Sequence, residues 1–253
     1  MFQTIVKIFL LVIITAAITP FIRKLAFVLG AVDNPNARRI NKKPMPTIGG
    51  LAIFVAFNIG EFVLLRKDFP THELFSVLLA SSVIILTGLI DDILELKPRQ
   101  KMFGIFVASL VVYFLAGIKV RELSLPFLGH IQLGWWSFPL TIFWILALTN
   151  AVNLIDGLDG LATGVTLISL VTMGIVGFFF LKSWQHYVPI MCIMLAACLL
   201  GFLPYNFHPA KIFLGDTGAL YIGFMISVLS LKGLKNVTFV SLLVPILILG
   251  VPI

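Results

Sequence analysis

Several acidic residues of this sequence stand at the ends of apolar runs, where a charged side chain needs a partner. Asp91 and Asp92 directly follow the apolar stretch GLI. Two adjacent carboxylates repel each other, so a divalent cation, a bound proton or a nearby lysine is expected to offset their charge. Asp216 stands a few residues into another apolar run. Because a lone carboxylate is costly to insert into a membrane, we predict that Asp216 is a metal ligand.

A further acidic segment, NAVNLIDGLDGLATG at 150–164, contains no cation. If the segment is helical, its three-residue spacing places Asn153, Asp156 and Asp159 along one face. Its glycines permit either close helix approach or a break. Carboxylates without a basic partner at membrane depth either hold a proton or meet a cation supplied from elsewhere. The segment PYNFHPAKIFLGDTGALYIGF at 204–224 adds Asn206 to the same group, whereas the interfacial His208 is more typical of a surface residue.

Basic residues accompany these acids. The segment RRINKKPMPTIGGLA at 38–52 joins cations to prolines and glycines that prevent a simple helix. Its backbone amides and cations could form an anion-binding site. The other interpretation is that these basic residues only set the orientation of the following span. Lys101 follows the Asp91–Asp92 pair after one more acid and two more cations.

The elements that must position these residues are membrane spans. Apolar residues make up 60% of the 253 residues and charged residues 11%, with a mean hydropathy of +1.10. No ordinary soluble domain has this composition, and continuous apolar runs exclude the alternating pattern of a β-barrel. We predict an all-α polytopic membrane protein that forms a single domain over 1–253. Nine spans are expected, at 5–21, 48–65, 74–90, 103–118, 135–148, 161–181, 188–203, 212–231 and 237–253.

Alternating the loops between two sides predicts the orientation. Ten cations fall on the face that carries Asp91 and Lys101, against seven on the other face, which favours the first as cytoplasmic. Trp135 and Trp136 fall at the opposite interface, where aromatic side chains anchor spans. Seven of the eleven acids share the cytoplasmic face with most of the cations. Basic cytoplasmic loops that face anionic lipid account for the net charge of +7, so nucleic acid is not an expected partner.

Oxygen-rich and basic groups from four separate loops therefore meet on one membrane face. Carboxylate and amide oxygens suit Mg²⁺, or Mn²⁺ as an alternative, and such ions bridge protein carboxylates and substrate phosphates. The pattern predicts phosphoryl transfer by positioning and charge neutralisation, with one substrate carried in the membrane. An ion-coupled transporter is the rival from another class, but the charges cluster at one interface and no inverted repeat is visible.

Taken together, the segments KKPMPTIGG, GLIDDILELKPRQK, NAVNLIDGLDGLATG and NFHPAKIFLGDTGALYIGF resemble the polyprenyl-phosphate N-acetylhexosamine-1-phosphate transferase superfamily, glycosyltransferase family 4. The resemblance spans roughly 30–225. It implies a bundle of ten or eleven spans, a cytoplasmic active site in a bacterial plasma membrane, and a requirement for Mg²⁺. The implied reaction moves a sugar 1-phosphate from a UDP-sugar to undecaprenyl phosphate and releases UMP. A homodimer is one option for its assembly.

Within the superfamily, GDTGALYIGF is closer to the branch that makes undecaprenyl-diphospho-N-acetylglucosamine for teichoic acid or other surface polysaccharides. PTIGG is similar to the pattern of the alternative branch, which transfers phospho-N-acetylmuramoyl-pentapeptide. The family continues after the ninth span into a loop with a His-rich motif, whereas this sequence stops at Ile253 inside an apolar run. A truncated chain is therefore expected.

The resemblance also implies roles for individual residues. Asp91, Asp92 and Asp156 are expected to be catalytic, with the Asp91–Asp92 pair placed at the lipid phosphate. Asp216 is the expected principal Mg²⁺ ligand, supported by Asn153. Substrate contacts are expected from a larger set of cations, amides and acids, which comprises Lys42, Lys43, Lys101, Asn206 and Asp159.

Overall fold

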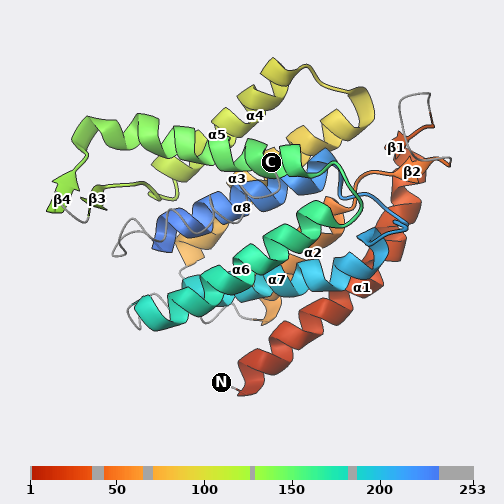
Figure 1. The fold of residues 1–253 in the computed structure, drawn as a ribbon, viewed down its shortest axis with the longest axis horizontal. Coiled ribbons are helices and arrows are strands. Elements are labelled where there is room, and N and C mark those ends of the chain that lie inside the picture. Colours follow the sequence, from red (N-terminus) through yellow and green to blue (C-terminus); the bar gives the residue numbers. More distant parts are fainter. Residues whose placement is uncertain (1, 36–42, 65–70, 126–128, 182–186, 234–253) are drawn as a thin grey trace.

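The structure is a computed structural model that describes residues 2–35, 43–64, 71–125, 129–181 and 187–233. Helices dominate it (Figure 1). They are α1 (Phe2–Leu29), α2 (Gly50–Ile59), α3 (Thr71–Leu94), α4 (Pro98–Phe114), α5 (Ser137–Ile155), α6 (Leu161–Phe180), α7 (Tyr187–Asn206) and α8 (Gly215–Gly233), with a π-helical turn η1 at Gly60–Leu64 and a 3-10 turn η3 at Gly134–Trp136.

Within the described residues, five helices are long and apolar enough to cross a bilayer, so this is a multi-pass membrane protein. Their spans are Thr4–Leu29, Thr71–Leu94, Gly134–Ile155, Leu161–Phe180 and Tyr187–Asn206. Helices α2, α4 and α8 coincide with three more predicted spans, but they do not combine that length with that hydropathy. The ninth predicted span, 237–253, lies outside the described residues. The predicted count of nine spans is therefore not confirmed.

The described part of the chain contains two short antiparallel hairpins between its helices. The predicted all-α membrane protein did not include them, although the structure is mainly helical, as that prediction expects. Strand β1 (Val32–Asp33) pairs with β2 (Met45–Pro46), and β3 (Glu122–Leu125) pairs with β4 (Gly129–Gln132). The hairpins lie at opposite ends of the bundle (Figure 1). The two-residue strands β1 and β2 are too short to show an alternating pattern, whereas β3 (ELSL) does alternate between polar and apolar residues over its four positions.

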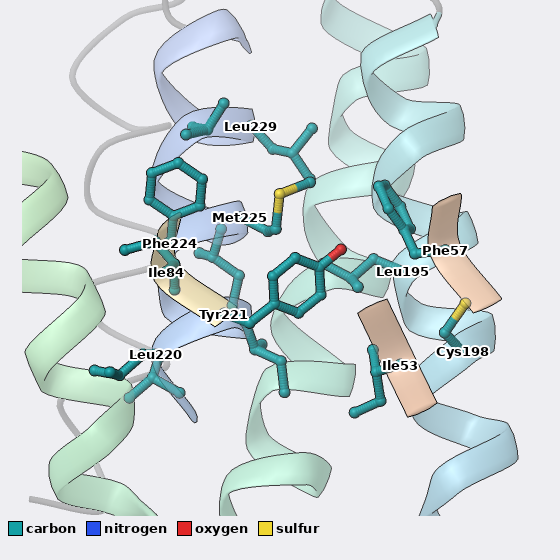
Figure 2. Packing of buried hydrophobic residues seen from close by; sticks show 14 of the residues in the cluster. Ile53, Phe57, Ile84, Leu195, Cys198, Leu220, Tyr221, Phe224, Met225 and Leu229 are labelled. Atoms are coloured by element: carbon teal, nitrogen blue, oxygen red, sulfur yellow. The ribbon is translucent and has the colours of Figure 1, made fainter. Parts of the chain in front are cut away.

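Helix α8 lies at the centre of the bundle and contacts α2, α3, α5, α6 and α7. Its apolar side chains are almost completely buried, as Figure 2 shows for Tyr221, Phe224 and Met225. The facing residues include Ile84 of α3 and Leu195 of α7. Helix α1 covers α7 and α2 from the outside. A central α8 explains why the first residues of this helix can reach several other elements at once.

Glycines let the first turn of α8 approach its neighbours backbone to backbone. A side chain at Gly50 of α2 would overlap the backbone of Gly218, and one at Gly88 of α3 would overlap the backbone of Thr217. Gly215, with φ of +71°, makes the turn into α8, and a side chain there would overlap the carbonyl of Thr47. The start of α8 is thus wedged between α2 and α3.

Candidate active site

A cavity of about 470 Å³ opens where the first turn of α8 meets the ends of α3 and α5 and the β1–β2 hairpin. This volume falls within the usual range for small-molecule sites. Its walls are mainly polar and acidic: they comprise Val32, Asp33, Thr47, Asp91, Asp92, Glu95, Lys101, Asn153, Asp156, Gly157, Leu158, Asp159, Asn206, Phe213, Leu214, Gly215 and Asp216. The four segments singled out in the sequence therefore meet in one place.

Lys101 lies between two of the predicted carboxylates. Its Nζ is 2.5 Å from Oδ2 of Asp91 and 3.0 Å from Oδ1 of Asp216. Lys101 belongs to α4, Asp91 to α3 and Asp216 to α8, so three helices share one ammonium group. Asp91 is buried, and its other oxygen, Oδ1, accepts a hydrogen bond of 2.7 Å from the backbone N–H of Leu96. Of the three expected ways to offset the adjacent acids, a divalent cation, a bound proton or a nearby lysine, the structure shows the lysine at Asp91.

Asp216 also binds α5. The side-chain amide of Asn153 donates a hydrogen bond to Oδ1 of Asp216, the same oxygen that faces Lys101. The two residues predicted as metal ligands are therefore in direct contact. Asp216 is the first acidic side chain of α8, and a carboxylate at this end is favourable for the helix dipole.

Asp92 has different partners from its neighbour Asp91. Its Oδ1 accepts a hydrogen bond of 3.0 Å from the backbone N–H of Asp216, and its Oδ2 accepts bonds from the backbone N–H of Thr217 (3.0 Å) and from the Thr217 hydroxyl (2.6 Å). Asp92 thus holds the first N–H groups of a helix that is distant in sequence. The sequence reading missed Thr217, although its place directly after Asp216 was a usable signal.

The acidic segment 150–164 is not one continuous helix, so its three acidic and amide positions do not follow one helix face. Helix α5 ends at Ile155, and Asp156 follows with a non-helical backbone (φ −75°, ψ 54°). A turn then leads to Gly160, whose φ of +72° begins α6. Asn153, Asp156 and Asp159 still line one cavity because the turn folds back over it. The glycines thus act as the break that the sequence allowed.

Burial is the main influence on Asp156. It raises the pKa of this carboxyl group to about 7, and the negative charges of Asp216 and Asp92 act in the same direction. A carboxyl group with this pKa changes its protonation state near neutral pH. Asp156 lies just after the last residue of the α5 span, and the expectation that it holds a proton or meets a cation stays a prediction.

Asp159 and Asn206, predicted to contact substrate, are engaged by the protein itself. Oδ2 of Asp159 accepts a hydrogen bond of 3.0 Å from the backbone N–H of Ala210 and lies 3.0 Å from Nδ1 of His208. The side-chain oxygen of the buried Asn206 accepts a hydrogen bond from the Thr163 hydroxyl, and its amide nitrogen donates one to the carbonyl of Ile212. Both residues line the cavity, and these contacts fix the loop between α7 and α8.

The basic segment contributes less to the described cavity than the sequence suggested. Lys43 is exposed and is not among the residues that line the cavity, and Lys42 lies outside the described residues. The neighbouring Val32, Asp33 and Thr47 do line it and were not predicted. Asp33 is one of the seven acids assigned to the same predicted face as Asp91, and its position before Asn34 and Pro35 was the available signal.

The donor set suits a hard divalent cation. Carboxylate and amide oxygens dominate the walls, and Mg²⁺ is commonly held by one or two carboxylates together with substrate phosphates and water. Among the described residues, no group of three or more Asp, Glu, His or Cys side chains converges as a complete metal cage. The polar walls of the cavity are compatible with such an ion, for which Asp216 and Asn153 stay the predicted protein ligands.

Comparison with known proteins agrees with this geometry. Residues 74–234 match the family described as glycosyl transferase family 4. The chain is 43% identical over 238 residues to the "Probable undecaprenyl-phosphate N-acetylglucosaminyl 1-phosphate transferase" of Bacillus subtilis (strain 168), covering 93% of this chain and 65% of that protein.

Two other relatives carry the name "Phospho-N-acetylmuramoyl-pentapeptide-transferase". The one from Clostridium botulinum (strain Eklund 17B / Type B) is 36% identical over 84% of this chain and 67% of its own length, and the one from Bacillus velezensis (strain DSM 23117 / BGSC 10A6 / LMG 26770 / FZB42) is 33% identical over 88% and 72%. This chain spans about two thirds of the length of the curated relatives it matches. The family match covers the helices that build the cavity, from α3 to α8, and the chain belongs to glycosyl transferase family 4.

Proposed function

We propose that this protein transfers N-acetylglucosamine 1-phosphate from UDP-N-acetylglucosamine to undecaprenyl phosphate and releases UMP. The observation that carries the proposal is the cavity in which Asp91, Lys101 and Asp216 meet, in a chain that is 43% identical to a protein named for this reaction. The product, undecaprenyl-diphospho-N-acetylglucosamine, would begin synthesis of teichoic acid or another surface polysaccharide.

The reaction needs one bond to form and one to break. An oxygen of the ionised acceptor phosphate attacks the β-phosphorus of the UDP-sugar, and the bond from that phosphorus to the bridging oxygen breaks. UMP leaves with the electron pair, and the sugar keeps its own phosphate. Because the acceptor is already ionised near neutral pH, the protein's main task is to align two anionic groups and to neutralise the charge that develops between them.

Lys101 is suited to this neutralising role. An ammonium group has three N–H donors, and among the described residues Asp91 and Asp216 accept two of them. A third donor is left for a phosphate oxygen. Asp91 holds the ammonium group in place, because its other oxygen is fixed by the backbone N–H of Leu96.

Asp216 and Asn153 would hold Mg²⁺, with Mn²⁺ as an alternative. When bound, such an ion supplies neutralisation of phosphate charge and polarises the reacting phosphoryl group. Asp156, whose pKa burial raises to about 7, would take up or release a proton at the neighbouring wall of the cavity. Asp159 would keep the α7–α8 loop closed over the sugar side of the site through its bonds to His208 and Ala210.

The setting of the reaction follows from the same assignment. We place the cavity on the cytoplasmic side of a bacterial plasma membrane, where a soluble UDP-sugar is available. The acceptor reaches the site from the bilayer through its lipid chain. Lys42 and Lys43 stay predicted contacts for the phosphates, and a homodimer stays a prediction about assembly.

A second donor has specific support. Relatives named as phospho-N-acetylmuramoyl-pentapeptide transferases match 84% to 88% of this chain. The alternative function is therefore transfer of phospho-N-acetylmuramoyl-pentapeptide to the same kind of lipid acceptor. The two donors share the UDP group and differ in the size of the sugar substituent.

The test is UMP release by purified protein in lipid nanodiscs. UDP-N-acetylglucosamine and UDP-N-acetylmuramoyl-pentapeptide are each supplied with undecaprenyl phosphate, with Mg²⁺ or with EDTA. We expect lipid-dependent and metal-dependent release with the first donor. The variant Asp216→Asn should reduce release by at least about 100-fold, with unchanged insertion into membranes. No release with either donor would overturn the proposal, and release with the second donor alone would select the alternative.

A further inference from the structure

The two adjacent carboxylates Asp91 and Asp92 make separate sets of contacts. Asp91 forms an ion pair with Lys101 in the cavity wall, with an N–O separation of 2.5 Å. Asp92 turns toward the first turn of α8 and accepts three hydrogen bonds from Asp216 and Thr217. This difference in partners implies a difference in role.

The lone pairs of Asp92 are largely used by these bonds. A carboxylate has about four lone-pair positions, two on each oxygen. Oδ2 accepts from both the N–H and the hydroxyl of Thr217, and Oδ1 accepts from the N–H of Asp216. A group that abstracts a proton or binds a metal needs a lone pair directed at its target. Asp92 has little capacity left for either task.

The same bonds resemble a helix N-cap, except that the capping side chain comes from another helix. The first N–H groups of a helix lack partners within it, and an acidic side chain there satisfies them and favours the helix dipole. Asp92 supplies this cap from the end of α3 to the start of α8. The residue that carries the predicted metal-binding side chain, Asp216, is one of the two residues whose N–H groups are capped.

Packing leaves the capped turn little freedom to move. Gly88 precedes Asp92 by four residues in α3, so the two lie on one face of that helix. A side chain at Gly88 would overlap the backbone of Thr217, and Thr217 itself is fully buried. On the other side, the backbone N–H of Gly50 donates to the carbonyl of Leu214 at 3.0 Å. The backbone of Asp216 is therefore held from two helices.

We propose that Asp92 is a positioning residue: with Thr217 it fixes the start of α8 and so directs the side chain of Asp216 into the cavity. The proposal rests on the function proposed above and refines it, because it moves Asp92 out of the catalytic set. Asp91 and Asp216 remain the carboxylates that share Lys101. The Thr217 hydroxyl, buried beneath the cavity, becomes a determinant of metal binding that touches no substrate.

The experiment compares two substitutions at Thr217 in purified protein in nanodiscs. Thr217→Val removes the hydroxyl but keeps the shape, and Thr217→Ser keeps the hydroxyl. Thr19→Val is the matched control, because Thr19 is also fully buried and its hydroxyl donates a hydrogen bond to the carbonyl of Thr15 in its own helix. Mn²⁺ binding is measured by loss of the free-ion electron paramagnetic resonance signal, and kcat and KM are measured by UMP release.

We expect Thr217→Val to weaken Mn²⁺ binding and to lower kcat about ten-fold each, a loss of about 1.4 kcal/mol. KM for the UDP-sugar should stay within about two-fold, Thr217→Ser should restore both values, and Thr19→Val should change neither. Asp92→Asn should weaken Mn²⁺ binding as well, and adding Thr217→Val to it should cost little more, because the two residues act through one contact.

Two results would overturn the proposal. One is an unchanged Mn²⁺ affinity in both Thr217→Val and Asp92→Asn, with turnover lost only in the latter, which would make Asp92 catalytic. The other is a wild-type protein that binds no Mn²⁺, since no ligand would then be positioned. A wild type that binds Mn²⁺ but releases no UMP would contradict the proposed function instead, and the Mn²⁺ titrations would still decide the role of Asp92.

Discussion

Lys101 is the residue on which the charge balance of the cavity depends. It is about one fifth exposed, and two carboxylates from different helices share its ammonium group. If one charged side chain of such a partly buried group is removed, the charges of the remaining side chains are no longer neutralised. The same removal also strengthens the negative potential felt by any other cation in the cavity.

Lys101→Met should therefore have opposite effects on catalysis and on metal binding. We expect UMP release to fall by about 100-fold, because a phosphate contact is lost. Mn²⁺ affinity should rise, because Asp91 and Asp216 then lack their shared cation. Lys101→Arg, which keeps the charge, should leave Mn²⁺ affinity close to that of the wild type. A decrease in both quantities for Lys101→Met would show that the lysine acts by holding the fold together.

Asp156 predicts a pH dependence of stability with a definite sign. Its pKa is about 7 in the folded protein, against about 3.9 for an aspartate in an unfolded chain. The protonated form is therefore favoured by folding. The contribution of the Asp156 carboxyl group to the free energy of unfolding is fully present below about pH 4 and is lost as the pH rises through about 7.

The asparagine side chain is neutral at every pH, so we expect Asp156→Asn to remove this loss of stability at higher pH. In EDTA, the unfolding temperature of the variant should exceed that of the wild type by about 2 °C or more at pH 8, and the difference should shrink toward pH 5. The measurement is thermal unfolding in detergent by tryptophan fluorescence at several pH values. If the unfolding temperatures of the two proteins differed by the same amount at every pH, the assignment of a raised pKa to Asp156 would be contradicted.

At the scale of elements, the contact between α3 and α8 depends on the absence of a side chain at Gly88. Gly88→Ala would place a methyl group against the backbone of Thr217 and Asp216, which cannot move aside as a flexible side chain could. We expect a loss of stability of about 1–3 kcal/mol, together with reduced turnover because the start of α8 is displaced.

Gly164→Ala is the control for this substitution. Gly164 lies inside α6, and an added side chain there meets nothing within 4 Å. Alanine favours a helix over glycine by roughly 0.5–1 kcal/mol, so this variant should be as stable as the wild type or slightly more stable. Unfolding temperatures of the two alanine variants in detergent test the pair. Equal changes in both would show that the α3–α8 approach is not tight.

Sequence reasoning could predict the helices and the acidic cluster but not the contacts within it. Asp91, Asp156 and Asp216 were identifiable because charges at the ends of apolar runs are expensive. Nothing in their spacing shows that Asp91 faces Lys101 while Asp92 faces Thr217. That distinction depends on how α3 is rotated against α8, which is set by the packing of glycines such as Gly88. The β1–β2 hairpin was missed because two-residue strands have no period to detect.

At the scale of the whole molecule, we predict that the polar cavity faces water on one side of the membrane and that exposed aromatic side chains lie at the opposite interface. The cavity lies at one end, and Trp135 and Trp136, which are 96% and 74% exposed, stand at the start of α5. Exposed aromatic side chains at the end of a span are typical of a lipid–water interface. The proposed cytoplasmic cavity would put these tryptophans at the outer surface.

Cysteine labelling can test this orientation without removing native thiols. Cys192 and Cys198 are buried, so a membrane-impermeant maleimide should not label the native protein. Arg99→Cys, near the cavity, should react only after the cells are permeabilised, and Gln132→Cys, in β4, should react in intact cells. Both native positions are exposed. The reverse pattern would place the cavity outside the cell.

The acidic walls of the cavity have a consequence for how fast anionic substrates arrive. Seven acidic side chains and one lysine line the described cavity, although the whole chain carries a net charge of +7. The local field near the opening therefore repels phosphates, even though the distant field attracts them. Mobile ions shorten the range of such fields to about 10 Å at 0.1 M salt. Added monovalent salt should thus speed the encounter with a UDP-sugar at the cavity, the opposite of what the net charge alone would suggest.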